Sequence, residues 1–275
     1  MNLAFAMLAL SGLAYLAAFG LHLWSFRDAQ EKSHRPGFMC MQIGFLIGTF
    51  YFAVDAVARG ILLPVTGLSP ALAFFAWSLA FVYLVLLARA QSDSFGLILT
   101  PALFAFTLAA ALTFQPGPAQ PFELGKNPLF IIHILSAFFA YASLTISFAA
   151  GLLYLIQNHQ LKSKTAGTFY HKLPALEELE KLIYQPMTWG ASLLLAAVLL
   201  GLVWAKAVYG EFWIADPKTI ASSVTVLIYF AILILRYTTS LRAKKGAVLA
   251  LAAFLMVLFS FVGTRFIEGS HNYLR

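Results

Sequence analysis

Charged residues and cysteine are both scarce in this chain. Asp, Glu, Lys and Arg make up only 11% of the 275 residues, whereas 61% of the residues are hydrophobic. That balance excludes a soluble domain and favours a polytopic helical membrane protein. Because Cys40 is the only cysteine, the chain has no internal disulfide and no CxxC pair. It therefore cannot by itself perform dithiol exchange.

Motifs of the common enzyme classes are also missing. The sequence contains no P-loop, no nucleophile elbow and no zinc signature, and we expect the chain not to be an enzyme. The net charge of +7 comes from Lys and Arg gathered in a few connections between apolar runs. In a membrane protein such residues report orientation, so no nucleic-acid partner is expected.

Apolar runs long enough to cross a bilayer occur eight times. A transmembrane helix needs about 20 mainly apolar residues, and such runs fall near 3–25, 38–58, 68–90, 95–114, 129–157, 187–208, 219–239 and 246–268. The expected fold is all-α, a single transmembrane domain over residues 1–275. The start, MNLAFAMLAL, lacks basic residues, so the first run is expected to be an uncleaved helix.

The distribution of Lys and Arg predicts which way the helices face. With the N-terminus outside, the inward-facing connections hold 12 of the 18 basic residues and the outward-facing ones hold 6. Cytoplasmic connections carry an excess of Lys and Arg, so both termini are predicted to lie outside the cytoplasm. We expect a multi-pass protein of the cell membrane, in a bacterium the inner membrane, surrounded by membrane lipid.

Several helix boundaries carry local signals. A capping side chain precedes a proline in Ser69-Pro70, Asn127-Pro128 and Asp216-Pro217, a pattern typical of helix starts. Pro101 lies inside the fourth run and is expected to kink that helix without ending it. The segment PALEELEKLIYQP, in the longest connection, predicts either a short helix along the membrane surface or the beginning of the next span.

The crossing between the sixth and seventh runs is rich in aromatic rings. It reads WAKAVYGEFWIADPK from Trp204 to Lys218 and holds Trp204, Tyr209, Phe212 and Trp213. Such rings either offer flat faces to a planar apolar ligand or form an aromatic belt at the membrane interface. Taken alone, the crossing fits a belt better than a ligand site, and Asp216 is explained by capping alone.

Two of the six histidines are predicted to share the outer surface with this crossing. His133 follows Pro128 by a turn and a half, roughly 8 Å into its helix, and His271 follows Gly269 just after the last run. Imidazole is a regular axial ligand of haem iron, and cations suit the haem propionates. The available cations are Lys126, Lys206, Lys218 and Arg265. Each histidine alone also fits an interfacial hydrogen-bonding role.

The other histidines have simpler interpretations. His22, beside Trp24 in the first run, is expected to lie at the inner membrane interface. The remaining three, His34, His159 and His171, fall in inner connections and are expected to be solvated. Asp55 and Arg59 are four residues apart, a spacing that pairs side chains on one helix face without any function.

The order of these features resembles the cytochrome c assembly family of membrane proteins, the CcsA, CcmC and CcmF group of haem handlers. The family's external segment, with a pattern like WGxYWxWDPKE, corresponds here to YGEFWIADPK: Tyr209 and Gly210 replace WG, Trp213 is retained, and Asp216-Pro217-Lys218 is intact. The family's two external histidines match His133, in NPLFIIHILSAFFAYASL, and His271, in GSHNYL. The similarity covers about the last 150 residues, an assembly-like core of about 125–275.

Two departures point to the smaller HemX/YpjD branch of that family. Ala215 stands where the pattern has its next Trp. Ile234, two residues before Arg236, stands where the haem exporters have a histidine that contributes to a second haem site within the membrane. The segments LPALEELEKLIYQP and VGTRFIEG also look like that branch.

The resemblance implies a haem-handling protein of cytochrome c biogenesis. Haem would be the cofactor, with His133 and His271 as axial ligands and Trp204, Tyr209, Gly210, Trp213, Asp216 and Lys218 around the macrocycle. The implied partners are other cytochrome c biogenesis proteins and apocytochrome c. A rival interpretation is a regulatory or scaffolding subunit that keeps the fold without haem and acts through the basic inner loops at 158–185 and 236–245. A small-molecule transporter is least favoured, because the spans hold few ionisable residues.

Overall fold

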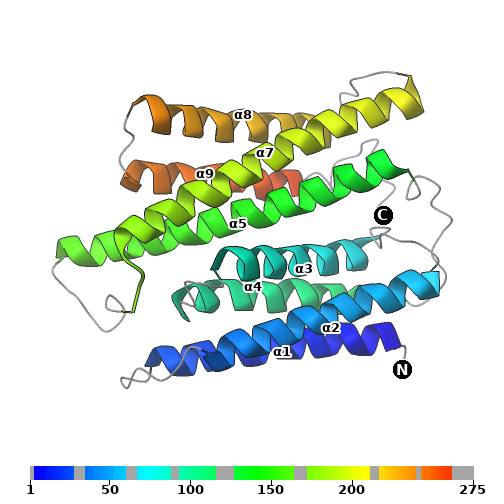
Figure 1. The fold of residues 1–275 in the computed structure, drawn as a ribbon, viewed down its shortest axis with the longest axis horizontal. Coiled ribbons are helices and arrows are strands. Elements are labelled where there is room, and N and C mark those ends of the chain that lie inside the picture. The colour runs from blue at the N-terminus through cyan, green and yellow to red at the C-terminus, as the bar shows by residue number, and fades with distance from the viewer. Residues whose placement is uncertain are drawn as a thin grey trace. The chain divides into compact units, whose positions relative to one another are not determined.

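Eight α-helices form the part of the chain that the computed structural model describes, residues 3–27, 35–59, 67–87, 93–115, 127–163, 172–210, 217–239 and 243–261. They are α1 (Leu3–Arg27), α2 (Arg35–Arg59), α3 (Leu68–Leu87), α4 (Asp93–Leu112), α5 (Pro128–Ser163), α7 (Leu176–Tyr209), α8 (Pro217–Thr238) and α9 (Ala243–Phe261) (Figure 1). Each is long and apolar enough to cross a membrane. The all-α polytopic fold with eight spans is therefore confirmed, while the side on which the termini lie stays a prediction.

α7 starts earlier than the apolar pattern alone predicts, and two helices continue through a proline. α7 begins at Leu176, before its apolar run starts, so the segment PALEELEKLIYQP begins the span and does not form a separate surface helix. α7 continues through Pro186, and α4 continues through Pro101 as expected. Proline removes one backbone hydrogen bond, but neighbouring helices make such a loss tolerable in a membrane-spanning helix.

The predicted helix starts have different outcomes. Asn127 caps α5 as expected, because its Oδ1 accepts a hydrogen bond from the backbone N–H of Leu129 at 2.9 Å. The prediction for Ser69 is wrong: α3 already begins at Leu68, and the Ser69 hydroxyl donates instead to the carbonyl of Ala110 in α4 at 2.7 Å. The Ser69 hydroxyl therefore bonds to α4 and does not cap its own helix. α8 begins at Pro217, and Asp216 lies outside the described residues.

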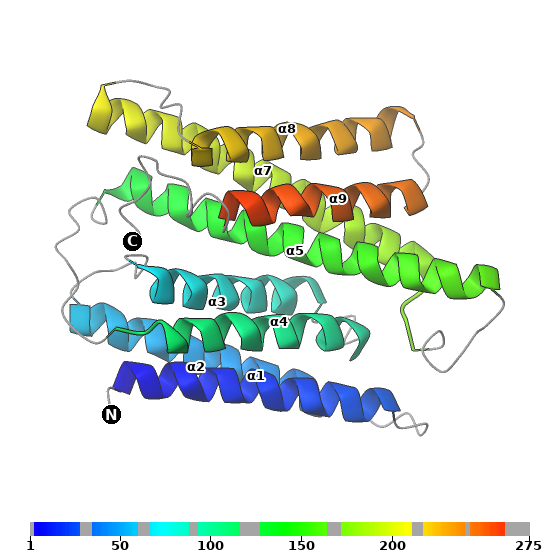
Figure 2. The same ribbon diagram turned by 180° about the vertical axis from the view of Figure 1, so that it is seen from behind.

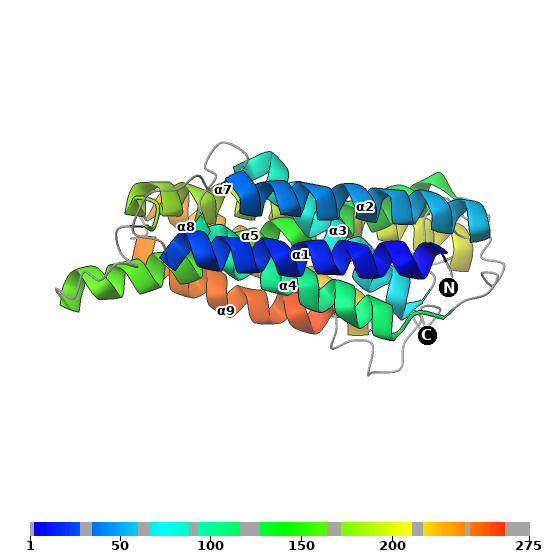
Figure 3. The ribbon, with the colours of Figure 1, turned by 90° about the horizontal axis from the view of Figure 1, so that it is seen from below.

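The first of two compact units contains α1 to α4 together with residues 172–174. In this unit α1 packs against both α2 and α4, and α3 packs against α4 and α2; Figure 3 shows α1 lying between α2 and α4. The Lys172 ammonium donates to the carbonyls of Ser25 and Phe26 at 3.1 and 2.8 Å. Because these are among the last carbonyls of α1, Lys172 satisfies the C-terminal end of that helix.

A histidine lies inside this first unit. His22 is only 2% exposed, because two glycines leave room for its ring. A Cβ atom at Gly37 of α2 would lie 2.8 Å from His22 Cε1, and one at Gly96 of α4 would lie 2.5 Å from Nε2. The expectation that His22 lies at the membrane interface is therefore wrong. Asp55 is also buried, at 2% exposure, while the side chain of Arg59 lies outside the described residues.

The second unit contains α5, α7, α8 and α9. Within it α5 packs against α7 and α9, and α8 packs against α7 and α9, so the four helices form a closed ring (Figure 2). α5 has 36 residues and α7 has 34, about 54 and 51 Å of helix, which exceeds the roughly 30 Å of a bilayer core. One end of this unit, here called the Pro128 end, gathers the start of α5, the end of α7, the start of α8 and the end of α9 (Figure 1).

Candidate functional site

His133 lies near the Pro128 end of the second unit, on the side of α5 that faces α7. Its ring is partly buried, and its Nδ1 atom lies 2.7 Å from the backbone carbonyl oxygen of Ala197. A carbonyl oxygen only accepts hydrogen bonds, so Nδ1 carries a proton and donates it to Ala197. In the neutral form of such a ring the lone pair is on Nε2, which is the arrangement that metal-binding histidines use.

Small residues on α7 allow this close approach. A Cβ atom at Gly201 would lie 3.0 Å from His133 Cε1 and 3.1 Å from Nδ1, tighter than an ordinary van der Waals contact. Ala197, Gly201 and Ala205 follow one another at intervals of four residues, so they form a stripe on one face of α7. Such stripes let two membrane helices pack closely, and this one brings the backbone of α7 within hydrogen-bonding reach of the imidazole.

An aromatic pair lies beside the histidine. The ring centroids of Phe130 and His133 are 6.4 Å apart, and those of Phe130 and Trp204 are 5.3 Å apart. Phe130 is fully buried and Trp204 is 4% exposed, because α7 continues to Tyr209 and Trp204 faces α5 from within the helix. Trp204 therefore packs behind Phe130 inside the unit, and its role around a macrocycle stays a prediction.

The start of the aromatic crossing is fixed by Gly210. This residue ends α7 with φ +82°, in the left-handed region that favours glycine. Its N–H donates to the carbonyl of Lys206 at 3.1 Å, and the Lys206 ammonium donates to the Gly210 carbonyl at 2.7 Å. Lys218, partly buried, lies in the first turn of α8. Of the other predicted residues, the side chain of Tyr209 and the whole of Trp213, Asp216 and His271 lie outside the described residues.

The last turn of α9 is tied to its neighbours at the same end. Ser260 Oγ lies 3.0 Å from Tyr141 Oη of α5 and 2.9 Å from Ser222 Oγ of α8. The ring centroid of Phe261 is 5.8 Å from that of Phe138 and 5.5 Å from that of Tyr141. The position from which the chain leaves α9 is thus set by hydrogen bonds and ring contacts, and His271 follows Phe261 by ten residues.

The chemistry of this cluster suits one axial bond to a haem iron. Imidazole with its Nδ1–H donated to a carbonyl is the usual proximal arrangement, and buried rings exclude water around an apolar macrocycle. Among the described residues no three His, Cys, Asp or Glu side chains gather as metal ligands. A macrocycle that supplies its own equatorial nitrogens needs no such group of side chains.

Sequence reasoning missed the residues that position His133. Phe130 lies three residues before it, and Ala197 and Gly201 lie on another helix. The available signal was the spacing of small residues in AAVLLGLVWA, which marks a close helix contact. The signal does not say which helix makes that contact, and only the fold identifies it as α5.

The helices define the class of the chain as a polytopic α-helical membrane protein. Near one end of its four-helix unit, the imidazole of His133 lies within hydrogen-bonding distance of a backbone carbonyl. Within this class, the family described as "Cytochrome C assembly protein" matches residues 65–271. The chain belongs to the cytochrome c assembly family. The match begins well before the last 150 or so residues in which the motifs lie.

Relatives of two kinds are similar to the chain. Protein HemX of Brevibacillus brevis is 27% identical over 253 residues, which cover 90% of this chain and 91% of that protein. Protein HemX of Bacillus subtilis (strain 168) is 28% identical over 256 residues, 92% and 89% of the two chains. The cytochrome c biogenesis protein CcsA of Porphyra purpurea is 27% identical over 249 residues, 76% and 78% of the two chains. The expected family and its HemX-like branch are confirmed.

A solved structure supports the fold. The chain superposes on the cytochrome c haem lyase CcmF with a TM-score of 0.68 and 17% sequence identity. The alignment covers 96% of this chain and 49% of the other, so this chain spans about half the length of CcmF. At this identity the likeness shows the arrangement of helices and nothing about activity.

Proposed function

We propose that the chain is a haem-handling protein of cytochrome c biogenesis that binds haem through His133 and His271. The observation that carries the proposal is the 2.7 Å contact between His133 Nδ1 and the Ala197 carbonyl, which leaves the lone pair on Nε2. Membership of the cytochrome c assembly family supports the same role. So do the names of its relatives, which include cytochrome c biogenesis proteins.

His271 is the proposed second ligand. Ser260 and Phe261 hold the end of α9 against Tyr141 of α5, and Tyr141 lies eight residues, about 12 Å along the helix, from His133. The ten residues from Phe261 to His271 span at most about 33 Å when fully extended. His271 is therefore within reach of the Pro128 end of the unit, where His133 lies.

The crossing after α7 would surround the macrocycle. Gly210 turns the chain out of α7 with φ +82°. The residues proposed to contact the macrocycle are Tyr209, Gly210, Trp213, Asp216 and Lys218. Trp204, which is buried, would support them by packing inside the unit. Bound haem would supply the macrocycle that an apocytochrome attaches through its CxxCH thiols. This chain would bind and orient haem and present it to a partner, whose own thiols form the thioether bonds.

The proposed location is the cell membrane, in a bacterium the inner membrane, with both termini and the Pro128 end outside the cytoplasm. The connections at the opposite ends of the helices carry the excess of Lys and Arg that is typical of the cytoplasmic side, which supports this orientation. The partners proposed on this basis are other cytochrome c biogenesis proteins and an apocytochrome c at the outer surface.

The test is the absorption spectrum of the protein purified from haem-replete cells. We expect a Soret band in the wild type and its loss in the His133→Ala, His271→Ala double variant. His159→Ala is the matched control, because His159 lies on the same helix as His133 but is exposed at the opposite end. A Soret band of wild-type intensity in the double variant, or no band in the wild type, contradicts the proposal.

A regulatory or scaffolding subunit is the second candidate. One observation favours it: Trp204 is 4% exposed and serves packing. Such a subunit would keep a partner bound through the segments 158–185 and 236–245, which include helix ends as well as the connections between them. Co-purification of a partner that is unaffected by His133→Ala and Trp213→Ala, together with the absence of haem, supports this candidate over haem handling.

A further inference from the structure

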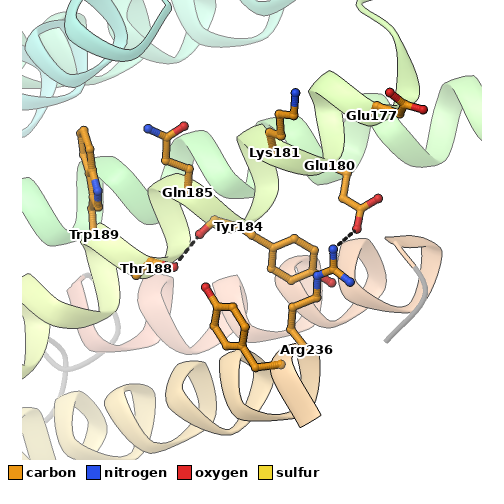
Figure 4. A pocket seen from close by; sticks show the side chains of 9 residues that line it. Glu177, Glu180, Lys181, Tyr184, Gln185, Thr188, Trp189 and Arg236 are labelled. Carbon is orange, nitrogen blue, oxygen red and sulfur yellow. Dashed lines mark hydrogen bonds and ion pairs between the residues drawn. The ribbon is translucent and has the colours of Figure 1, made fainter. Parts of the chain in front are cut away.

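A groove runs along α7 and the end of α8, far from His133. Figure 4 shows it, with a volume of about 640 Å³. Its lining comes from two helices of the second unit: Glu177, Glu180, Lys181, Tyr184, Gln185, Thr188 and Trp189 on α7, and Arg236 and Tyr237 on α8. Trp189 and Trp204 are fifteen residues apart on α7, about 22 Å along the axis. The groove is therefore separate from the candidate haem site.

Hydropathy places this groove at the edge of the membrane. On α7 the charged segment ends near Gln185 and the apolar run begins at residue 187, and on α8 the apolar run ends just before Arg236. Both helices thus change from apolar to polar at the groove. Trp189 is 45% exposed and Tyr237 is 78% exposed, and aromatic residues with such exposure are typical of the level of lipid headgroups.

The charges in the groove leave one acid and one base available. Arg236 forms an ion pair with Glu180 at 2.7 Å and its guanidinium lies 4.9 Å above the Tyr184 ring. Glu177 and Lys181, four residues apart on α7 and both exposed, make no ion pair among the described residues. Figure 4 draws both side chains away from the Arg236–Glu180 pair. A ligand with one negative and one positive group complements these two side chains.

Tyr184 forms part of the groove wall through its ring. It is 9% exposed, and the Arg236 guanidinium lies over the ring. A Cβ atom at Gly246 of α9 would overlap the Tyr184 hydroxyl, so this hydroxyl is enclosed by α9 and is not open to the groove. The polar groups that a ligand can reach are therefore the exposed side chains of Glu177 and Lys181.

We propose that this groove binds one phospholipid with a zwitterionic headgroup that carries a primary ammonium, as in phosphatidylethanolamine. The phosphate lies near Lys181, and the ammonium lies near Glu177. Trp189 and Tyr237 border the upper part of the acyl chains. A headgroup with net negative charge would leave Glu177 without a cationic group, whereas a zwitterionic headgroup complements both Glu177 and Lys181. A primary ammonium donates hydrogen bonds to a carboxylate, and a quaternary one does not. This inference does not depend on haem binding.

Native mass spectrometry of the full chain tests the inference. The protein is released from nanodiscs made of equal amounts of phosphatidylethanolamine, phosphatidylglycerol and phosphatidylcholine with identical acyl chains. We expect one phosphatidylethanolamine adduct to be enriched over the other two lipids. The Glu177→Gln, Lys181→Met double variant should lose this enrichment, by about tenfold for each 1.4 kcal/mol of lost charge-assisted hydrogen bonding.

Matched variants separate the groove from general surface charge. The Glu178→Gln, Lys162→Met double variant removes one exposed acid on α7 and one exposed base on α5 outside the groove and should keep the enrichment. Tyr184→Phe removes only the hydroxyl enclosed by α9, which the lipid does not reach, and should also keep the enrichment. Retention of the enrichment in both control variants supports the proposed site.

Four results of the lipid measurement overturn the proposal. They are no lipid preference in the wild type, a preference for phosphatidylglycerol, equal retention of phosphatidylcholine, and an equal loss in the Glu178→Gln, Lys162→Met control. A dimer that dissociates in the Glu177→Gln, Lys181→Met variant without a change in lipid adducts also overturns it, because a second copy of the chain would then be the occupant of the groove.

Discussion

His22 and His133 are two histidines that lie against glycines in separate helical units. The His22 ring is enclosed by Gly37 and Gly96 from two different helices and is 2% exposed. The His133 ring meets a single glycine, Gly201, remains partly exposed, and has its Nδ1 next to the Ala197 carbonyl. Because helices pack against the His22 ring from several sides, that imidazole is part of the core. The His133 ring is packed on one side and has a fixed tautomer, so it is suited to be a ligand.

Replacing each of these histidines by alanine should give opposite results. His133→Ala is expected to lower the haem content by about tenfold or more, since each 1.4 kcal/mol of lost binding is a factor of ten. His22→Ala should leave the haem content unchanged but lower the unfolding temperature, because it leaves a cavity between α1, α2 and α4. The Soret absorbance per protein and thermal unfolding in detergent measure the two effects. Loss of haem in His22→Ala together with retention of haem in His133→Ala would contradict the roles assigned to the two histidines.

Filling the space beside His22 should destabilise the first unit. A Cβ atom at Gly96 would lie 2.5 Å from His22 Nε2, so Gly96→Ala forces the ring or the helix to move. We expect a loss of about 1–3 kcal/mol in the free energy of unfolding, the usual cost of overpacking. Gly20→Ala is the control, because a Cβ atom there has no neighbour within 4 Å and alanine favours the helix. Equal unfolding temperatures for the two variants contradict the enclosed environment of His22.

Filling the space beside His133 should have a smaller effect on stability and a specific effect on haem. A Cβ atom at Gly201 would lie 3.0 Å from His133 Cε1, a contact that a shift of a few tenths of an ångström relieves. We expect Gly201→Ala to keep the fold and the haem, with a shifted haem midpoint potential because the hydrogen bond to Ala197 is disturbed. Redox titration of the haem-loaded protein measures this shift. A potential equal to that of the wild type shows that Gly201 does not position the ligand.

The smallest effect is expected from the ring pair behind His133. Trp204→Leu removes a contact with Phe130 at 5.3 Å between centroids, and such pairs contribute about 0.5–1.5 kcal/mol beyond their buried area. Thermal unfolding should show a modest loss of stability, with most of the haem retained. Trp189→Leu on the same helix is the control, because Trp189 is 45% exposed. A larger destabilisation by Trp189→Leu contradicts the buried role of Trp204.

The number and type of the helices followed from the sequence, but some boundaries did not. Runs of about 20 apolar residues are sufficient to identify spans. The first turns of α7, in LEELEKLIYQ, carry charges, so hydropathy alone misses them even though Leu, Glu and Lys favour helices. Ser69 shows the opposite case, because a local capping signal was overridden by the Ala110 carbonyl on another helix.

The candidate site was predictable only in its positions along the chain. Asn127-Pro128 fixes the start of α5 and hence the depth of His133. The face of α5 that meets α7 depends on tertiary packing, so neither Ala197 nor Gly201 could be assigned to His133 beforehand. His22 was misplaced for the same reason: the glycines that enclose it, Gly37 and Gly96, belong to α2 and α4.

The most direct test of His133 as a haem ligand is the spectrum of the haem-loaded His133→Gly variant before and after imidazole is added. The glycine variant should lose the low-spin spectrum of haem with two nitrogen ligands, and free imidazole, which fits the space that the side chain leaves, should restore it. His22→Gly should show the wild-type spectrum throughout. A wild-type spectrum in His133→Gly without imidazole would contradict the account.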